Sequence, residues 1–163
     1  ALYVGISNYN TEQTSKIKKI FDELKTPFII NQPSYSMLNR WIEEDGLKDY
    51  AYENGLGLAV FSPLAQGLLT DKYLKTNTGS SSRPWMKSQP DENTLKKLKK
   101  LNEIAANRGQ KLSQMALSWV LRDDKITTVL IGASRPEQIT ENLQAVFKTD
   151  FSQEELTAIE DTL

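Results

Sequence analysis

Four short apolar runs recur along the chain and predict four buried strands. They are "LYVGIS" (Leu2 to Ser7), "PFIINQ" (Pro27 to Gln32), "LGLAVFS" (Leu56 to Ser62) and "TTVLIGA" (Thr127 to Ala133). Each run is nearly continuous in apolar residues rather than alternating with polar ones. That pattern is typical of strands that are covered on both faces, as in a parallel sheet.

Helical patterns fill the intervals between these runs. Apolar residues spaced three or four positions apart mark four of the expected helices: Ile17, Ile20, Phe21 and Leu24; Leu95, Leu98 and Leu101; Leu112, Met115, Ala116, Trp119 and Val120; Ile139, Leu143 and Val146. Asn10 with Gln13, and Ser152 with Glu155, have the spacing of a capping box and predict two helix starts. Residues 40–53 also have a helical pattern, which Gly46 interrupts.

The order of elements predicts a parallel α/β fold. Residues 75–93, "KTNTGSSSRPWMKSQPDEN", are rich in Ser, Asn, Gly and Pro and predict a mobile loop. The remaining order is β-α-β-α-β-loop-α-α-β-α-α. Four βα units allow either a small open doubly wound sheet or half of a (β/α)8 barrel, which typically needs about 250 residues. The chain starts at a strand without an initiator Met, so we expect one partial domain over residues 1–163.

Composition narrows the classes of function. The formal net charge of −1 gives no general attraction to nucleic acid or to an anionic membrane. No apolar run approaches the roughly 18 residues that span a bilayer, and the N-terminus lacks the basic start of a signal peptide. The chain has no Cys, which excludes disulfides and fits a cytoplasmic protein. It has no His, which removes imidazole bases and histidine metal sites, so we expect no metal.

Polar residues follow every predicted strand. The strand ends carry Ser7-Asn8, Asn31-Gln32-Pro33, the segment from Phe61 to Gly67, and Gly132-Ala133-Ser134. In parallel α/β folds the carboxyl ends of the strands share one rim, where functional residues gather. Amides and hydroxyls there can hold a flat polar ligand, although Ser and Asn are also common as turn and cap residues.

The fourth strand leads into a possible anion site. Ser134 and Glu137 have capping-box spacing, and the N–H groups of a helix N-terminus attract phosphate. Gly132 leaves room for close approach to the backbone, and Arg135 can supply positive charge. Glu141 and Asn142 lie a turn later, where they either reach the same ligand or face water.

These motifs together resemble the C-terminal half of an aldo-keto reductase. The segments "GISNYN", "NQPSYSMLNR", "FSPLAQGLLTDKY", "GQKLSQMALSWVL" and "VLIGASRPEQITEN" follow that family's order and approximate spacing over nearly the whole chain. The "GAS" followed by "EQ" and "EN" is similar to the branch of bacterial L-glyceraldehyde 3-phosphate reductases and potassium-channel β-subunits.

The resemblance implies a fold, a cofactor and a set of contacts. The four strands become the fifth to eighth of a (β/α)8 TIM barrel that binds NADP(H) across its C-terminal rim. Ser7, Asn8 and Gln32 would hold the nicotinamide carboxamide, and Phe61 would stack on its ring. The remaining cofactor contacts fall into two groups: Ser62, Pro63, Leu64, Gln66, Gly67 and Lys72 around the pyrophosphate; Gly132, Ser134, Arg135, Gln138, Glu141 and Asn142 around the adenosine and its 2′-phosphate. The loop that contains Arg83 would fold over the cofactor.

The resemblance also implies what this chain lacks. The family's Asp, Tyr, Lys and His tetrad comes from the first four strands, so no residue here is expected to be catalytic. We therefore expect the cofactor-binding half of a reductase of aldehydes or ketones, inactive by itself. Unpaired sheet edges lead us to expect pairing with the missing half-barrel or with itself. Two alternatives remain open: a regulatory module like the channel β-subunits, and a self-standing α/β domain for another phosphorylated ligand.

Overall fold

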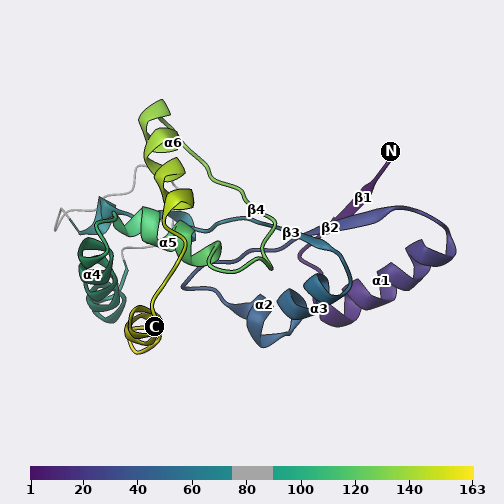
Figure 1. Cartoon of the computed structure of the whole chain (residues 1–163), viewed down its shortest axis with the longest axis horizontal. Helices are drawn as coiled ribbons and strands as arrows, with labels where there is room; N and C mark the ends of the chain where they lie inside the picture. The colour runs from purple at the N-terminus through teal and green to yellow at the C-terminus, as the bar shows by residue number, and fades with distance from the viewer. Residues whose placement is uncertain (75–89) are drawn as a thin grey trace. The chain divides into compact units, whose positions relative to one another are not determined.

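The computed structural model describes residues 1–74 and 90–163, which divide into two compact units (Figure 1). Unit 1 consists of Ala1–Pro63 and Asp123–Ile131, and unit 2 of Leu64–Arg122 and Gly132–Leu163. The loop predicted over residues 75–93 falls mostly outside the described residues. Its last two residues belong to a helix that starts at Glu92. The single partial domain expected from the sequence stays a prediction.

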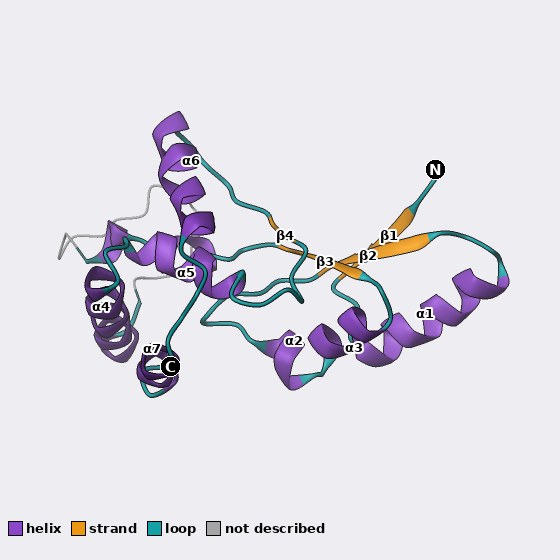
Figure 2. Cartoon of the chain, viewed as in Figure 1, coloured by secondary structure: helices purple, strands orange, loops and turns teal. Residues whose placement is uncertain are grey.

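Unit 1 contains a four-stranded sheet and three helices (Figure 2). All three strand pairs are parallel, and Ser7 of the first strand lies opposite Gln32 of the second. The elements of this unit are β1 (Val4–Ser7), α1 (Thr11–Glu23), β2 (Phe28–Gln32), α2 (Trp41–Glu44), α3 (Leu47–Glu53), β3 (Gly57–Val60) and β4 (Thr128–Val129).

The strand order decides between the two architectures that the sequence allowed. The sheet runs β1-β2-β3-β4, in chain order and without a reversal. A doubly wound sheet reverses its order at a switch point, whereas the strands of a (β/α)8 barrel follow one another around the ring. Because parallel crossovers are right-handed, the two connections within unit 1, from β1 to β2 and from β2 to β3, lie on the same face of the sheet. The fold is therefore a run of (β/α) units from a barrel.

Local sequence signals set the helix starts of unit 1. Asn10 caps α1: its side chain accepts from the backbone N–H of Gln13 at 2.9 Å, and the Gln13 side chain accepts from the N–H of Asn10 at 3.1 Å. This confirms the predicted capping box. The helical pattern over 40–53 is instead two helices, because Gly46 adopts a left-handed φ of 79° between α2 and α3. A residue without a Cβ takes that conformation at little cost.

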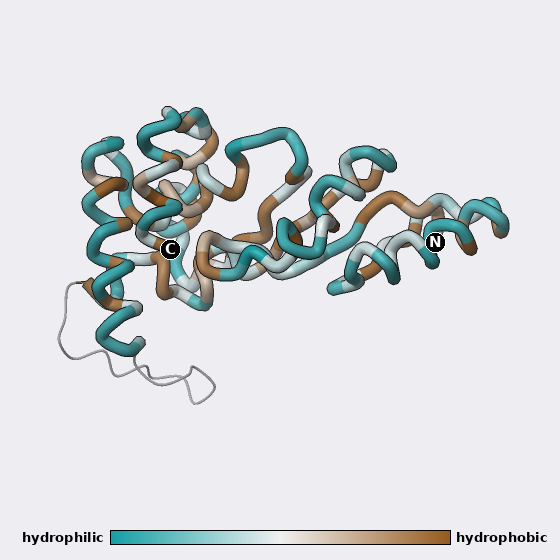
Figure 3. Tube along the Cα trace, turned by 90° about the horizontal axis from the view of Figure 1, so that it is seen from below, coloured by the Kyte–Doolittle hydropathy of each residue, from teal (hydrophilic) through white to brown (hydrophobic). Residues whose placement is uncertain are grey.

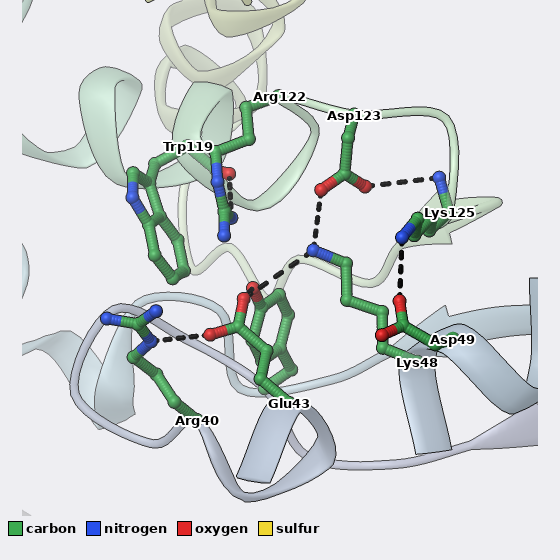
Figure 4. Close-up of polar contacts among 9 residues, drawn as sticks. Arg40, Glu43, Lys48, Asp49, Trp119, Arg122, Asp123 and Lys125 are labelled. Carbon is green, nitrogen blue, oxygen red and sulfur yellow. Dashed lines mark hydrogen bonds and ion pairs between the residues drawn. The ribbon is translucent and has the colours of Figure 1, made fainter. Parts of the chain in front are cut away.

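An ion-pair network joins α2 and α3 to the segment that precedes β4 (Figure 4). Lys48, only 6% exposed, places its Nζ 2.6 Å from Asp123 and 3.5 Å from Glu43. Lys125 donates to Asp49 at 2.6 Å, again between α3 and this segment. All of these residues belong to unit 1. The network fixes the approach to β4, which itself contributes only two residues to the sheet.

Unit 2 is helical, and its core lies between α4, α5 and the C-terminal segment. Its elements are η1 (Ala65–Gly67), η2 (Asp71–Tyr73), α4 (Glu92–Asn107), α5 (Leu112–Val120), α6 (Pro136–Leu143), η3 (Gln144–Phe147) and α7 (Gln153–Glu160). The predicted stripe on α5 is buried, with Met115 and Trp119 at 0% exposure. On α4, Leu98 and Leu101 are 0% exposed, whereas Leu95 is only half-buried. Ser152 and Glu155 form the predicted capping box at the start of α7.

A buried arginine holds the C-terminal segment of unit 2. Arg108, at 3% exposure, donates to Glu155, to the carbonyls of Lys148 and Asp150, and to Gln110. Its guanidinium also lies 3.6 Å from the centroid of the Phe151 ring. Since every part of this cation has a partner, its burial is compatible with a stable fold.

Several apolar side chains of the described residues remain uncovered, among them Ile20 and Leu24 of the stripe predicted on α1, at 48% and 66% exposure. The stripe predicted on residues 139–146 is helical, but Ile139, Leu143 and Val146 are 47%, 53% and 51% exposed, and the neighbouring Phe147 is 80% exposed. In unit 1, Leu2 and Tyr3 beside the β1 edge are 84% and 63% exposed. Hydrophobic stretches alternate with hydrophilic ones along the helices (Figure 3). Within the described ranges, no helix has the length and apolar character to cross a membrane.

Candidate functional site

In unit 1, the ends of β1 and β2 are joined by hydrogen bonds among the residues that were predicted to face the ligand. The carbonyl of Gln32 accepts from the Ser7 hydroxyl at 2.9 Å and from the backbone N–H of Asn8 at 3.2 Å. The side-chain oxygen of Asn8 accepts from the backbone N–H of Ser34 at 3.2 Å. The structure therefore brings Ser7, Asn8 and Gln32 together, as the sequence predicted.

This arrangement leaves two amide groups available. The Asn8 side chain uses its oxygen on Ser34, and its NH2 group makes no hydrogen bond within the described part of the chain. The side-chain amide of Gln32 likewise has no partner in that part, because only its backbone carbonyl is engaged. Two adjacent amides can pair with a ligand that carries both a donor and an acceptor, such as a carboxamide.

The end of β3 continues past the sheet in an irregular backbone. Phe61 extends the pairing by donating its N–H to Pro33 at 3.0 Å and accepting from Tyr35 at 3.1 Å. Ser62 then adopts a left-handed φ of 56°. Pro63 is buried, whereas Ser62 is exposed. A non-glycine residue in this conformation costs about 1–2 kcal/mol and persists only where its surroundings impose it.

The same left-handed conformation continues in unit 2. Ala65, Gln66 and Gly67 have φ values of 47°, 58° and 94°. The turn is closed by bonds from the N–H groups of Gly67 and Leu69 to the carbonyl of Leu64, at 2.9 and 3.2 Å. Five non-glycine residues among those described have positive φ: Asn8, Lys25, Ser62, Ala65 and Gln66. Four of the five lie in the predicted site loops, where stored backbone strain is commonly found.

Lys72 lies in the next turn of unit 2. Its Nζ is 5.1 Å from the centroid of the Tyr73 ring, and its backbone N–H donates to the Thr70 hydroxyl at 3.4 Å. The side chain is exposed. Arg83, predicted in a loop that folds over the cofactor, lies outside the described residues.

The N-terminus of α6 differs by one residue from the prediction. Arg135, not Ser134, is the N-cap, and Pro136 is the first helical residue, a position that suits proline because its missing N–H would be unpaired anyway. The predicted pair of Ser134 and Glu137 is therefore not the capping box. The side-chain oxygen of Gln138 accepts from the N–H groups of Ser134 and Arg135, at 2.8 and 3.2 Å, and from the Ser134 hydroxyl at 3.2 Å. One carbonyl oxygen thus occupies the place of an anion.

Further along α6, Glu141 and Asn142 have different environments. Glu141 is held by α5: Lys111 lies 2.8 Å from its carboxylate, and Gln114 donates to its backbone carbonyl at 2.9 Å. Asn142 is 8% exposed as a residue, but its side-chain amide atoms are not among the fully buried atoms that lack a partner. Solvent or a bound ligand can therefore reach this amide.

Gly132, before α6, is free of structural constraint. A Cβ built at this position would meet nothing within 4 Å. The fold of unit 2 therefore does not require glycine here, and the open space leaves the backbone accessible to a ligand.

Sequence reasoning noted Asn31 only as a polar residue at a strand end, and it missed three other residues that hold the predicted ones in place. Ser34 and Asn31 support Asn8 and its loop in unit 1, and Lys111 and Gln114 support Glu141 in unit 2. Asn31 had a visible signal, since it is a polar residue inside the apolar run "PFIINQ". The other three depend on contacts between segments far apart in the sequence.

The resolved pKa shifts lie away from these residues. The pKa of Lys125 is raised by its hydrogen bond to Asp49, and that of Asp91 is lowered by hydrogen bonds from Thr94. The pKa of Glu12 is lowered by Lys16, and that of Glu154 by Ser152. Within residues 1–74 and 90–163, no cluster of three or more acidic side chains could hold a metal ion. The arrangement is one of amides, hydroxyls and backbone N–H groups, which suits binding of a polar ligand.

Comparisons with known proteins agree with this description. The sequence pattern of the aldo/keto reductase family matches residues 1–163. The chain is 48% identical to the L-glyceraldehyde 3-phosphate reductase of Escherichia coli, over 98% of this chain and 49% of that protein. It is 32% identical to a probable voltage-gated potassium channel subunit beta of Oryza sativa, over 90% of this chain and 47% of that protein. The chain thus spans about half the length of these relatives.

Solved structures show the same partial coverage. A glycerol dehydrogenase from Gluconobacter oxydans superposes with a TM-score of 0.77 at 26% identity, over 98% of this chain and 48% of that one. A thermostable aldo-keto reductase in complex with the inhibitor epalrestat gives a TM-score of 0.70 at 25% identity, over 99% and 48%. The fold and the sequence comparisons agree, and the chain belongs to the aldo/keto reductase family, of whose members it covers about half.

Proposed function

We propose that this chain is the cofactor-binding half of an NADP(H)-dependent reductase of aldehydes or ketones. The observation that carries the proposal is the set of strand-end residues: unengaged amides on Asn8 and Gln32, with left-handed backbone at Asn8, Ser62 and Gln66. The proposal includes a cytoplasmic location, which fits a chain without Cys.

The nicotinamide end is assigned to unit 1. The amides of Asn8 and Gln32 offer both donors and acceptors to a carboxamide, and the Ser7 hydroxyl, whose proton is engaged by Gln32, can accept. Phe61, at the end of β3, supplies an aromatic ring for stacking. When bound, NADPH supplies the hydride, while these residues hold its ring in one orientation.

The phosphate and adenosine contacts are assigned mainly to unit 2. A 2′-phosphate at the start of α6 would replace the Gln138 oxygen at the N–H groups of Ser134 and Arg135. Arg135 adds a positive charge beside it, and Asn142 offers its side-chain amide to the ligand. In unit 2, Leu64, Gln66, Gly67 and Lys72 are proposed as pyrophosphate contacts, and in unit 1 the same role is proposed for Ser62 and Pro63. Arg83, outside the described residues, keeps its predicted place in a loop over the cofactor.

We propose that the chain alone has no catalytic activity. It contains no His, and the family's tetrad belongs to the strands that precede those described here. Its partner is then a half-barrel with four more βα units, since β1 and β4 are sheet edges and apolar residues such as Leu2, Leu143 and Phe147 are uncovered. Self-association is the competing way to cover them.

Reconstitution tests both parts of this proposal. The chain is purified alone, then mixed with the complementary half of the Escherichia coli reductase, and NADPH oxidation is followed with a small phosphorylated aldehyde and with simple aldehydes. We expect no oxidation by the chain alone and measurable oxidation by the mixture. The control is a mixture with the Asn8→Ala, Gln32→Ala double variant, which should assemble but bind NADP+ at least tenfold more weakly. Turnover by the chain alone contradicts the proposal.

A regulatory role is the second candidate, and the identity to a probable potassium channel β-subunit favours it. Both candidates bind NADP(H) in this half, so binding does not separate them. The separating observation is the tetrad in the complementary half of the natural protein: an intact Asp, Tyr, Lys and His supports the reductase, and its loss supports the regulator.

A further inference from the structure

Asn31 is an amide at a strand position where a parallel sheet normally carries an aliphatic side chain. It lies in β2 next to Gln32, is 0% exposed, and its Oδ1 has no hydrogen-bond partner within the described part of the chain. A buried carbonyl oxygen without a donor destabilises a fold, and an aliphatic residue would avoid that cost. The amide therefore serves something other than packing.

The hydrogen bonds that the Asn31 side chain donates show what the amide does. Its Nδ2 donates to the carbonyl of Tyr9 at 2.9 Å and to the hydroxyl of Thr14 at 3.2 Å. Tyr9 lies in the loop between β1 and α1, and Thr14 is a fully buried residue of α1. Asn31 thus joins the strand that carries Gln32 to the loop that carries Asn8, entirely within unit 1.

That loop needs support. Asn8 has a φ of 57°, a conformation that is unfavourable unless its neighbours impose it. On one side the N–H of Asn8 is bonded to Gln32, and on the other Asn10 is fixed as the cap of α1. Tyr9 is the residue between them, and from the described residues its carbonyl receives one other bond, a long one of 3.4 Å from the Thr14 hydroxyl. Asn31 supplies the short bond that holds the middle of the loop.

We propose that Asn31 is a positioning residue: by holding the Tyr9 carbonyl, it keeps the side-chain amide of Asn8 in register with that of Gln32 for a bound carboxamide. The inference rests on the proposed function, because it assigns the nicotinamide end to these two amides. Asn31 does not touch the ligand; it acts through Asn8.

The test compares two ligands on two variants. NADP+ contains the carboxamide, whereas adenosine 2′,5′-bisphosphate carries the adenosine and 2′-phosphate without it. Dissociation constants are measured by calorimetry for the 163-residue chain assembled with the complementary half-barrel. For Asn31→Leu, we expect NADP+ to bind about tenfold more weakly and the bisphosphate to bind as it does to the wild type. Thr127→Val is the matched control, since it removes a 3.1 Å side-chain bond to the backbone of β3 but does not contact the loop.

A double-mutant cycle with Asn8→Ala tests the route of the effect. If Asn31 acts through Asn8, the double variant binds NADP+ no more weakly than Asn8→Ala alone. Additive losses overturn the inference, as does an equal loss for both ligands or no loss at all. If the wild type binds neither ligand, the proposed function is wrong, and the inference that rests on it is wrong as well.

Asn31→Ala provides a second variant if Asn31→Leu does not fold. It removes the donor to the Tyr9 carbonyl without adding bulk or charge to this buried position. We expect the same selective loss for NADP+. An Asn31→Ala protein that binds NADP+ with wild-type affinity contradicts the proposed positioning role.

Discussion

At the scale of single residues, the backbone at the strand ends is more strained than the side chains alone indicate. Ser62 in unit 1, and Ala65 and Gln66 in unit 2, have left-handed φ values without being glycine. Each costs about 1–2 kcal/mol relative to an ordinary conformation. Strain of this kind survives where the surrounding contacts impose it, and it places backbone N–H groups in directions that a regular turn would not.

Ala65 offers a direct measure of that strain. Ala65→Gly should raise the free energy of unfolding by about 0.5 kcal/mol, because relief of the left-handed conformation exceeds the entropy that glycine adds to the unfolded chain. The matched control is Ala106→Gly, at an exposed position with ordinary helical backbone in the last turn of α4, and it should lower the free energy of unfolding by at most about 1 kcal/mol. Urea unfolding measures both. If Ala65→Gly destabilises as much as the control, the left-handed conformation is not strained.

A substitution at Gly132 should change the stability of the chain and its binding of NADP+ in opposite directions. Because a Cβ there meets nothing and φ lies outside the left-handed range, Gly132→Ala should raise the free energy of unfolding by about 0.5 kcal/mol. By the proposed function, the same methyl group approaches the 2′-phosphate and weakens NADP+ binding. Gly109→Ala is the control: Gly109 has a φ of 69° after α4, so the variant should lose stability and keep its affinity. Unchanged NADP+ binding in Gly132→Ala would remove Gly132 from the proposed contacts.

Among the elements, the connection from α3 to the start of β4 depends on one buried lysine. The side chains of Lys48 and Asp123 are 7% and 32% exposed, at an N–O distance of 2.6 Å. Lys48→Met leaves the Asp123 carboxylate without this cation, whereas Glu43 keeps its ion pair with Arg40. We expect a loss of about 2 kcal/mol in the free energy of unfolding, below the full value for a buried pair because Asp123 is partly solvated. Lys16→Met, in a pair that is more than two-thirds exposed, should leave the urea midpoint unchanged. Equal midpoints for both variants contradict this.

The N-terminus of α4 carries a pH-dependent contribution. Hydrogen bonds from Thr94 lower the pKa of Asp91 below its usual 3.8, so the ionised cap is favoured in the folded state. The sign follows from linkage: this stabilisation is complete above the unfolded pKa and is lost as pH falls through the lower folded one. The melting temperature of the wild type minus that of Asp91→Asn should therefore shrink between neutral pH and about pH 2. A difference that does not change with pH contradicts this assignment.

Elements were predictable from sequence where their signals are local. The capping boxes of α1 and α7 and the buried positions of α4 and α5 follow from spacings of three and four residues. β4 is shorter than the predicted 127–133, since a strand's extent depends on pairing, and beyond Leu130 no neighbour in the described sheet bonds it. At the site, residue identities were predictable, but the left-handed turns and the supports from Asn31 and Lys111 depend on distant contacts.

For the whole molecule, the governing feature is uncovered apolar surface together with unpaired sheet edges. β1 and β4 end the sheet, and Leu143 and Phe147 are 53% and 80% exposed in unit 2. A net charge of −1 provides almost no repulsion between copies. The physical expectation is association, with the complementary half-barrel where it is present and with further copies where it is not.

The apolar stripe on α6 and η3 gives this expectation a test that does not depend on activity. Leu143→Asp and Phe147→Asp place a charge where we expect a covered surface, so each should weaken binding to the complementary half-barrel at least tenfold. Gln144→Asp adds the same charge at an exposed polar position between them and should bind as the wild type does. Sedimentation velocity of labelled halves measures all three. Wild-type association by both apolar variants would show that the stripe faces solvent in the assembled protein, and the half-barrel would then be completed through its strand edges alone.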